Sequence, residues 1–367
     1  MTRYKPVIGV SEGVTLLFIF ISAKVFLTHI IFVLHDGMNA SWMIYVLNTL
    51  VALPGVLLLA AVLDRYPGRD LVQIGEQLTG PYINSLFSLF YLAVFIGGAG
   101  LTLRSISERV VAGFMPDTPI SMVTLFFLAG TVAVAYLGLE AVARTARFLV
   151  WVLVVSILTL IVLTIPFWQW HVFYPLWGSG PLGLLLGTLR NTGDFVHILL
   201  LGIIFPFLPA GKARLVGVWG VLITGFFTTL LLLTVLLIFT YPTASELTLP
   251  TLEIARTINI GRFGQRLEIV FLPIWVFGNM IFISASLYAG AAVLARMCRL
   301  SDFRPFVLAM TVFSTVVAFI PQSAPQVSLL IYRYQSRYSF YALVLILLLM
   351  LLAARIRRGG AENEQNA

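Results

Sequence analysis

A lysine stands in the middle of an otherwise apolar stretch near the start of the chain. Lys24 lies within residues 16–34, a run long enough to cross a membrane, where a buried ammonium group is costly. Ionisable residues inside such runs are functional candidates, so Lys24 is predicted to hold a carboxylate or to replace a bound Na⁺. The alternative is a structural lysine paired with an acidic side chain from another span.

A second polar interruption, LRNTGDFVH at 189–197, occurs in a later apolar run. The two interruptions together predict a site for a small ligand, made by Ser22, Ala23, Lys24, Thr192, Asp194 and His197. Asp194 is expected to pair with Lys24, and the neighbouring Arg190 is its alternative partner. His197 can line the site, but a hydrogen-bonded core histidine is the commoner role for such a residue.

Two further charge pairs are candidates for gating. Arg104 and Glu108 are spaced to share one helical face, which permits an ion pair within a span. They either gate a ligand path or lock the outer end of that span. A short helix is predicted to begin after the last proline of the long loop 241–265, where Glu253 and Arg256 share a face. This helix either closes the outer mouth as a lid or is a packed surface element.

The composition identifies the chain as an integral membrane protein. Of its 367 residues, 60% are hydrophobic and only 10% are charged. The net charge of +8 comes from basic residues scattered between apolar runs, which favours membrane topology over nucleic-acid binding. Cys298 is the only cysteine, so no intrachain disulfide is possible. The sequence shows no enzyme, cofactor or metal motif.

The apolar runs predict an all-α polytopic fold with ten spans in a single transmembrane domain, residues 1–367. The expected spans are 8–34, 41–63, 83–113, 120–138, 145–166, 182–208, 214–240, 266–295, 304–321 and 338–355. Ten spans divide into two inverted halves, with repeat one at about 8–166 and repeat two at about 182–355. Spans one and six then correspond, and both are predicted to be broken helices around a midplane site.

The distribution of lysine and arginine predicts the orientation of the chain. The loops 35–40, 114–119 and 167–181 carry neither residue and are expected outside. The loops 241–265 and 322–337 are exceptions, since both are expected outside and both contain arginines. Both termini are therefore predicted to be cytoplasmic, and the polar tail 359–367 is predicted to be disordered.

Several short motifs, in order along the chain, resemble those of spore germination permeases, the B subunits of germinant receptors. The longest is LPTLEIARTINIGRFGQRLEIVFLPIWVF, which covers the outer loop and the start of span eight. RSISE followed by PDTPI, then GLEAVAR, FYPLWGSGPLGLLLGT, FLP and PQSAPQV are similar to further segments of these permeases. The resemblance extends over nearly the whole chain.

This resemblance implies a fold, partners and a role. The permeases belong to the amino acid–polyamine–organocation superfamily, which has the LeuT-like inverted repeat. They sense small germinants, usually amino acids, beside an A-type subunit and a lipoprotein C-type subunit in the spore inner membrane. Two departures from the family pattern concern the site: SAKVF replaces a glycine-rich break in span one, and Ile203 replaces a glutamate late in span six.

The sequence therefore predicts a receptor subunit that binds a small polar or zwitterionic ligand and triggers germination. A proton- or ion-coupled amino-acid transporter of the same fold is the alternative, in which Lys24 and Asp194 would exchange protons or ions. A scaffold or channel subunit without a ligand pocket is a third class, for which substitutions of these two residues would leave the response unchanged.

Overall fold

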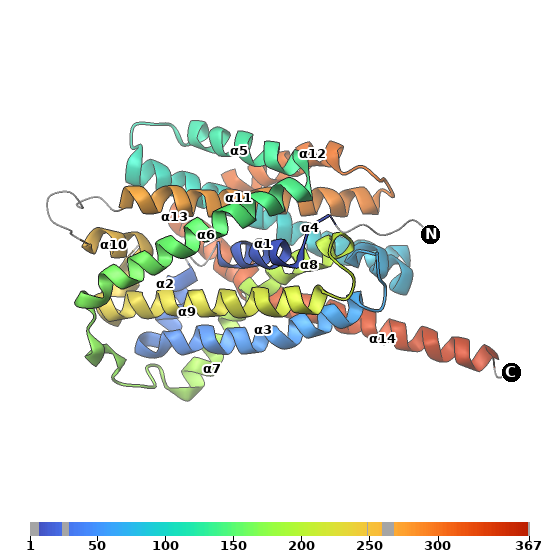
Figure 1. The fold of residues 1–367 in the computed structure, drawn as a ribbon, viewed down its shortest axis with the longest axis horizontal. Helices are drawn as coiled ribbons and strands as arrows, with labels where there is room; N and C mark the ends of the chain where they lie inside the picture. The colour runs from blue at the N-terminus through green and yellow to red at the C-terminus, as the bar shows by residue number, and fades with distance from the viewer. Residues whose placement is uncertain (1–6, 24–28, 248, 259–267, 366–367) are drawn as a thin grey trace.

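Every regular element in the described part of the chain is helical (Figure 1). The structure is a computed structural model that describes residues 7–23, 29–247, 249–258 and 268–365. Its α-helices are α1 (Val10–Ser22), α2 (Ile30–Gly37), α3 (Ser41–Leu63), α4 (Leu71–Phe114), α5 (Ile120–Leu137), α6 (Leu139–Thr164), α7 (Gly180–Asn191), α8 (Leu199–Ile204), α9 (Ala213–Glu246), α10 (Pro250–Thr257), α11 (Glu268–Met297), α12 (Arg304–Phe319), α13 (Ala324–Leu330) and α14 (Ser339–Gln365). The 3-10 segments are η2 (Met38–Ala40), η3 (Ile165–Phe167), η4 (Trp170–Phe173), η5 (Thr192–Ile198) and η6 (Phe205–Phe207), and η7 (Ile331–Ser336) is π-helical. The predicted all-α architecture is confirmed.

Eight helical stretches in the described ranges are long and apolar enough to cross a membrane. They are Ile30–Leu63, Leu71–Phe114, Ile120–Leu137, Leu139–Phe167, Gly180–Phe207, Ala213–Glu246, Trp275–Met297 and Ser339–Arg357. The bent pair of α12 and α13 is a ninth candidate, whereas α1, with 13 residues, is shorter than a usual span. Residues 24–28, between α1 and α2, lie outside the described ranges, so the ten-span count and the repeat boundaries stay predictions.

α4 begins earlier than predicted because a capping box starts it at Asp70. The Asp70 carboxylate accepts a hydrogen bond from the backbone N–H of Gln73, and the Gln73 side chain accepts one from the backbone N–H of Asp70. The helix changes direction at Gly80, whose φ of 81° is left-handed, and Pro81 follows it. The residues before Gly80 thus form a short helix ahead of the span predicted to start at residue 83.

The prediction of an outer loop at 322–337 was wrong, because most of this segment is helical. α13 begins after Ser323 with Pro325 in its first turn, where a missing N–H is tolerated. It bends from α12 by 117° and continues through the π-helical η7 towards α14. The polar and proline residues at 321–325 resemble a turn signal, but an apolar stretch follows them directly.

α14 continues past the predicted end of the last span at residue 355. It runs to Gln365, and the predicted disorder of the tail 359–367 stays a prediction. The side of the membrane on which the two termini lie stays a prediction.

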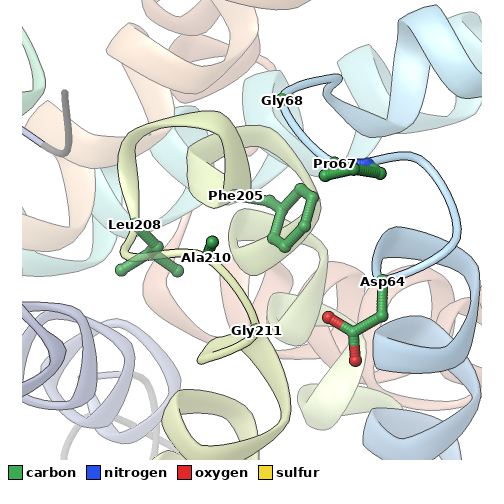
Figure 2. Close-up of a pocket in the computed structure, with 7 residues that line it drawn as sticks. All are labelled: Asp64, Pro67, Gly68, Phe205, Leu208, Ala210 and Gly211. Atoms are coloured by element: carbon green, nitrogen blue, oxygen red, sulfur yellow. The ribbon is translucent and has the colours of Figure 1, made fainter. Parts of the chain in front are cut away.

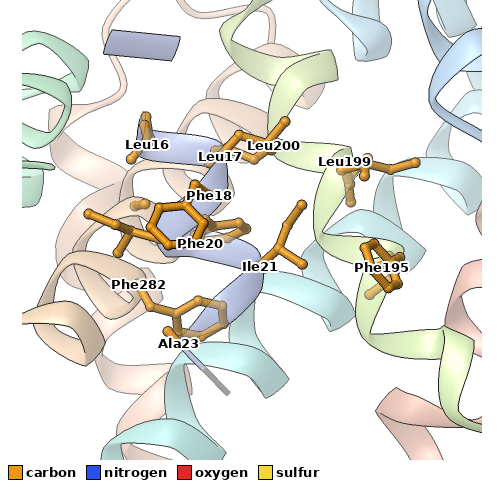
Figure 3. Packing of buried hydrophobic residues seen from close by; sticks show 14 of the residues in the cluster. Leu16, Leu17, Phe18, Phe20, Ile21, Ala23, Phe195, Leu199, Leu200 and Phe282 are labelled. Carbon is orange, nitrogen blue, oxygen red and sulfur yellow. The ribbon is translucent and has the colours of Figure 1, made fainter. Parts of the chain in front are cut away.

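α1 lies at the centre of the bundle. Residues 16–22 are all buried, and α1 packs against α6, α9 and α11. The ring of Phe20 stacks on that of Phe282, with centroids 4.7 Å apart, and Figure 3 shows both on one side of Ile21, with Phe195 and Leu199 on its other side. A helix that is apolar on every side needs such surroundings. The core of the protein is therefore built around its first helix.

Candidate functional site

The sixth span loses its regular winding where the sequence predicts a break. α7 ends at Asn191, η5 follows as a 3-10 segment, and α8 begins at Leu199. The hydroxyl of Thr192 lies 2.7 Å from the carbonyl oxygen of Thr188 and 3.0 Å from Oδ1 of Asn48 on α3. Side chains that bond to the local backbone compete with helical hydrogen bonds. The polar run thus ends α7 and places Asp194 against neighbouring spans.

Asp194 is the centre of a buried polar network that joins four elements. Its Oδ2 lies 3.2 Å from Nε2 of His29, at the start of α2. Its Oδ1 accepts a hydrogen bond of 2.6 Å from Ser336 on η7. His29 Nδ1 lies 3.0 Å from the hydroxyl of Tyr45 on α3. The side chains of Asp194 and His29 are only 4% and 2% exposed, so the carboxylate depends on these partners for stabilisation.

The predicted partners of Asp194 have different outcomes. Arg190, the alternative partner, instead pairs with Asp36, whose Oδ1 lies 3.2 Å from the arginine Nη1. Lys24 lies outside the described residues, so its pairing with Asp194 and its place at a break of the first span stay predictions. His29 was not predicted as a partner of Asp194. It lies within the same apolar run as Lys24, where a polar side chain indicates a candidate functional residue.

The other predicted ligand-site residues are buried close to this network. His197 Nδ1 lies 2.6 Å from the carbonyl oxygen of Asp194, and its ring packs edge-on against Phe20 and Phe282. Ser22 donates its hydroxyl to the carbonyl of Phe18 at 2.7 Å, within α1. Ala23 is 3% exposed. Aromatic rings therefore surround His197, and their contact with a ligand stays a prediction.

A second polar cluster lies at the other end of α2 and in the last turn of α7, and we call it the Asp36 clasp. Besides Arg190, the carboxylate of Asp36 accepts hydrogen bonds from Asn191 Nδ2 at 2.7 Å and from the Tyr332 hydroxyl at 3.4 Å. The Tyr332 ring stacks on Phe32, with centroids 4.3 Å apart and an interplanar angle of 11°. The clasp joins α2, α7 and η7. This cluster was not predicted from the sequence, although Asp36 is the first acidic residue after the predicted first span.

Replacing Asp36 with alanine is expected to loosen these three elements. The change removes the acceptor for three donors, and hydrogen bonds to charged groups contribute about 1.5–3 kcal/mol. Deuterium uptake in α2, α7 and η7 should rise at least severalfold. Asp302→Ala is the matched control, because Asp302 is exposed and its carboxylate contacts Arg304, outside these three elements. Equal deuterium uptake in wild type and the Asp36 variant would show that the clasp does not hold α2, α7 and η7 together.

The two charge pairs predicted from spacing are both present. Arg104 Nε lies 2.7 Å from Glu108 Oε1, and both side chains are mostly buried. The Arg104 guanidinium also lies over the ring of Phe319 on α12, 5.6 Å from its centroid. The sequence analysis passed over Arg109, which is buried and donates from Nε to Ser105 Oγ at 3.2 Å. The gating role of the pair stays a prediction.

The loop helix predicted after Pro250 is α10. Arg256 Nη1 lies 2.8 Å from Glu253 Oε1 on its partly exposed face. Ile254 and Ala255 are buried, and α10 packs against α6, α9 and α11. It is thus a packed helix whose role as a lid stays a prediction, and residues 259–267 of the same loop lie outside the described ranges.

Two cavities lie near the end of the sixth span. The larger, about 370 Å³, is lined by Ile203, Asp70 and Tyr288 among others, and Arg296 Nε lies 2.8 Å from Asp70 Oδ2 there. Burial raises the pKa of the Asp70 carboxyl, and its bonds to Gln73 and Arg296 oppose that shift. Figure 2 shows the smaller, about 250 Å³, between two loops. It is lined by Asp64, Pro67, Gly68, Phe205, Leu208, Ala210 and Gly211.

Within the described residues, no group of three or more histidine, cysteine, aspartate or glutamate side chains is arranged to hold a metal ion. The polar groups of the site instead come in pairs of opposite character, a carboxylate beside an imidazole or a guanidinium. Such pairs can exchange partners with a small charged or zwitterionic molecule.

Comparisons with known proteins agree with this architecture. MhsT in complex with L-phenylalanine superposes with a TM-score of 0.69 at 14% identity, covering 92% of this chain and 87% of MhsT. Mhp1, a nucleobase-cation-symport-1 family transporter solved in a closed conformation with bromovinylhydantoin, gives a TM-score of 0.60 at 14% identity, covering 96% and 94%. The fold is therefore LeuT-like, as the sequence resemblance implies.

Sequence comparison identifies the family. A sequence model of the family described as spore germination protein matches residues 7–327, so the chain belongs to the spore germination protein family. Spore germination protein KB of Bacillus subtilis (strain 168) is 24% identical over 255 residues, which span 68% of each chain. Spore germination protein A2 of the same strain is 23% identical over 242 residues, 64% of this chain and 65% of A2. Family and fold together define a permease-like membrane protein of spore germination.

Proposed function

We propose that this chain senses a small polar or zwitterionic ligand, such as an amino acid, at the junction of α1, α2 and η5, and thereby triggers germination. The observation that carries the proposal is the buried carboxylate of Asp194 at a non-α-helical segment, paired with His29 and Ser336 from two other spans. A ligand ammonium can replace the imidazole beside that carboxylate, because both can donate a hydrogen bond to it. The predicted binding residues are Ser22, Ala23, Lys24, Thr192, Asp194 and His197.

The Asp36 clasp is proposed to act as the outer gate. It joins α2 and α7, the two helices that lead to Asp194. Tyr332 of η7 also donates to Asp36, so that η7 closes the same side of the bundle. A ligand that binds better when the clasp is formed shifts the population towards the closed state. A sensor needs only this difference in affinity between two states. Arg104 with Glu108, and Glu253 with Arg256 on α10, are proposed to tune the same equilibrium.

The proposed setting is a receptor complex in the spore inner membrane, which is a bacterial cytoplasmic membrane, with both termini in the cytoplasm. The proposed partners are an A-type subunit and a lipoprotein C-type subunit, as the resemblance to germinant-receptor permeases implies. No enzymatic reaction, cofactor, metal or nucleic acid forms part of this proposal. The repeats 8–166 and 182–355 are proposed to move against each other around the site.

A transporter is the second candidate function. Its support is the fold shared with Mhp1, a transporter solved with its ligand in a closed conformation. Purified chain in proteoliposomes distinguishes the two functions. Concentrative uptake of an amino acid by the chain alone favours transport, whereas saturable binding without uptake favours sensing.

A ligand screen tests the proposed function. Purified protein is heated with each common amino acid, and the apparent Tm is recorded. A ligand that prefers the folded state stabilises it by about 2.7 kcal/mol at 100 times its Kd, so one or a few amino acids should raise the Tm in a saturable way. A cooperatively unfolding protein whose Tm responds to none of them would contradict the proposal.

A further inference from the structure

Three arginines from separate parts of the chain converge on two residues of the short helix that starts α4. Arg69, in the loop before the helix, donates to the Gln77 side chain. Arg357, on α14, donates to the backbone carbonyl of Gln77 at 2.5 Å. Arg299, after α11, lies 2.8 Å from the carboxylate of Glu76. These three, with Glu76 and Gln77, form what we call the arginine cluster.

The arginine cluster carries more positive charge than its own residues neutralise. The cluster contains three guanidinium groups and one carboxylate, and of these three arginines Arg299 is the one paired with that carboxylate. Arg69 and Arg357 are exposed, and the Arg299 side chain is 74% exposed. Solvent-exposed ion pairs contribute little to folding stability, about 0–1 kcal/mol. The convergence of three long side chains is therefore poorly explained by folding stability alone.

Exposed apolar side chains border the arginine cluster. Directly after the change of direction at Gly80, Tyr82 is 91% exposed and Leu86 is 67% exposed. On α14, Leu352 and Ile356 are 54% and 67% exposed, just before Arg357. α14 packs against α4, and Figure 1 shows the far end of α14 at the same end of the bundle as the start of α4. The border of charge and apolar surface matches the boundary between lipid headgroups and acyl chains.

We propose that the arginine cluster binds the phosphate of an anionic phospholipid whose acyl chains lie along α4 and α14. A phosphate oxygen accepts hydrogen bonds from guanidinium groups in a bidentate way, and the arginines offer exposed N–H groups beyond those bonded to Gln77 and Glu76. The apolar border distinguishes a lipid from free phosphate or an acidic peptide, which need no such surface. The proposal is independent of the function proposed for the Asp194 site.

Native mass spectrometry of the purified full chain in detergent tests this proposal. Phosphatidylglycerol and phosphatidylcholine of equal chain length are titrated separately, and bound lipids are counted. Each arginine near an anionic lipid contributes about 1 kcal/mol, which is about fivefold in affinity. Arg69→Gln with Arg357→Gln should therefore weaken phosphatidylglycerol retention about 25-fold, without changing phosphatidylcholine retention. Inorganic phosphate at the same concentration should not displace the bound lipid.

Two further variants separate lipid binding from a structural role. Glu76→Gln removes the competing carboxylate and should strengthen phosphatidylglycerol retention about fivefold, an increase that no structural role for the cluster predicts. Arg147→Gln is the matched control, because Arg147 is an exposed arginine on α6 and should leave retention unchanged. The double variant Arg69→Lys with Arg357→Lys keeps the positive charge and is the control for misfolding of the double glutamine variant. Equal retention of both lipids by wild type, or unchanged retention in the double glutamine variant, would overturn the proposal.

Discussion

Asp194→Asn is expected to abolish ligand-induced stabilisation while leaving the fold intact. Asparagine keeps an oxygen that can accept the hydrogen bond from Ser336, but it removes the charge that lies 3.2 Å from His29. Loss of a buried charged partner costs about 2–5 kcal/mol of binding, so the affinity for an amino-acid ligand should fall at least about thirtyfold. The measurement is the ligand dose that raises the apparent Tm, in wild type and variant side by side.

Two comparisons make this prediction specific. Asp194→Ala leaves His29 and Ser336 without their acceptor and should destabilise the protein by about 3–5 kcal/mol, in contrast to the asparagine variant. Asp117→Asn is the same chemical change at an exposed position and should alter neither stability nor ligand response. A wild-type dose response in the Asp194→Asn protein would show that the Asp194 carboxylate is not part of the binding site.

Gly193→Ala is expected to force the sixth span away from η7. A methyl group at position 193 would stand 2.0 Å from the carbonyl oxygen of Ser336 and 2.7 Å from its Cα. Both are backbone atoms, so the contact cannot be relieved by a side-chain rotation. Overpacking costs about 1–3 kcal/mol and sometimes more, and we expect a fall of about 5 °C in the apparent Tm.

The same variant should also weaken ligand response, because the displaced backbone carries Asp194 away from Ser336. Gly97→Ala is the control, since a methyl group there has no neighbour within 4 Å. Alanine favours a helix over glycine by about 1 kcal/mol, so this control should be neutral or stabilising. If both alanine variants melt alike, the backbone contact between η5 and η7 does not hold the two spans together.

The sequence predicted the class of fold and the loss of regular winding at 189–197 because these depend on local patterns. The apolar runs predicted the membrane spans, and the polar run at 189–197 predicted the 3-10 segment η5. The four-residue spacing of Arg104 and Glu108 predicted their ion pair, since residues so spaced meet on a helix. Local spacing carries all of this information.

Contacts between distant spans could not be predicted in the same way. Asp194 meets His29 and Ser336, and Asp36 meets Arg190 and Tyr332, only after helices far apart in the chain have packed. The rotation of each helix decides which side chains face inward, and periodicity does not define it when a helix is apolar on every side. For the same reason, Arg190, a neighbour along the chain, was predicted as the alternative partner of Asp194.

The central position of α1 has a consequence for the assembly of the protein in the membrane. α1 has 13 residues, and its main packing partners, α6, α9 and α11, are all synthesised after it. The buried surface of α1 is therefore covered completely only when α11, the last of these three helices along the chain, has joined the bundle.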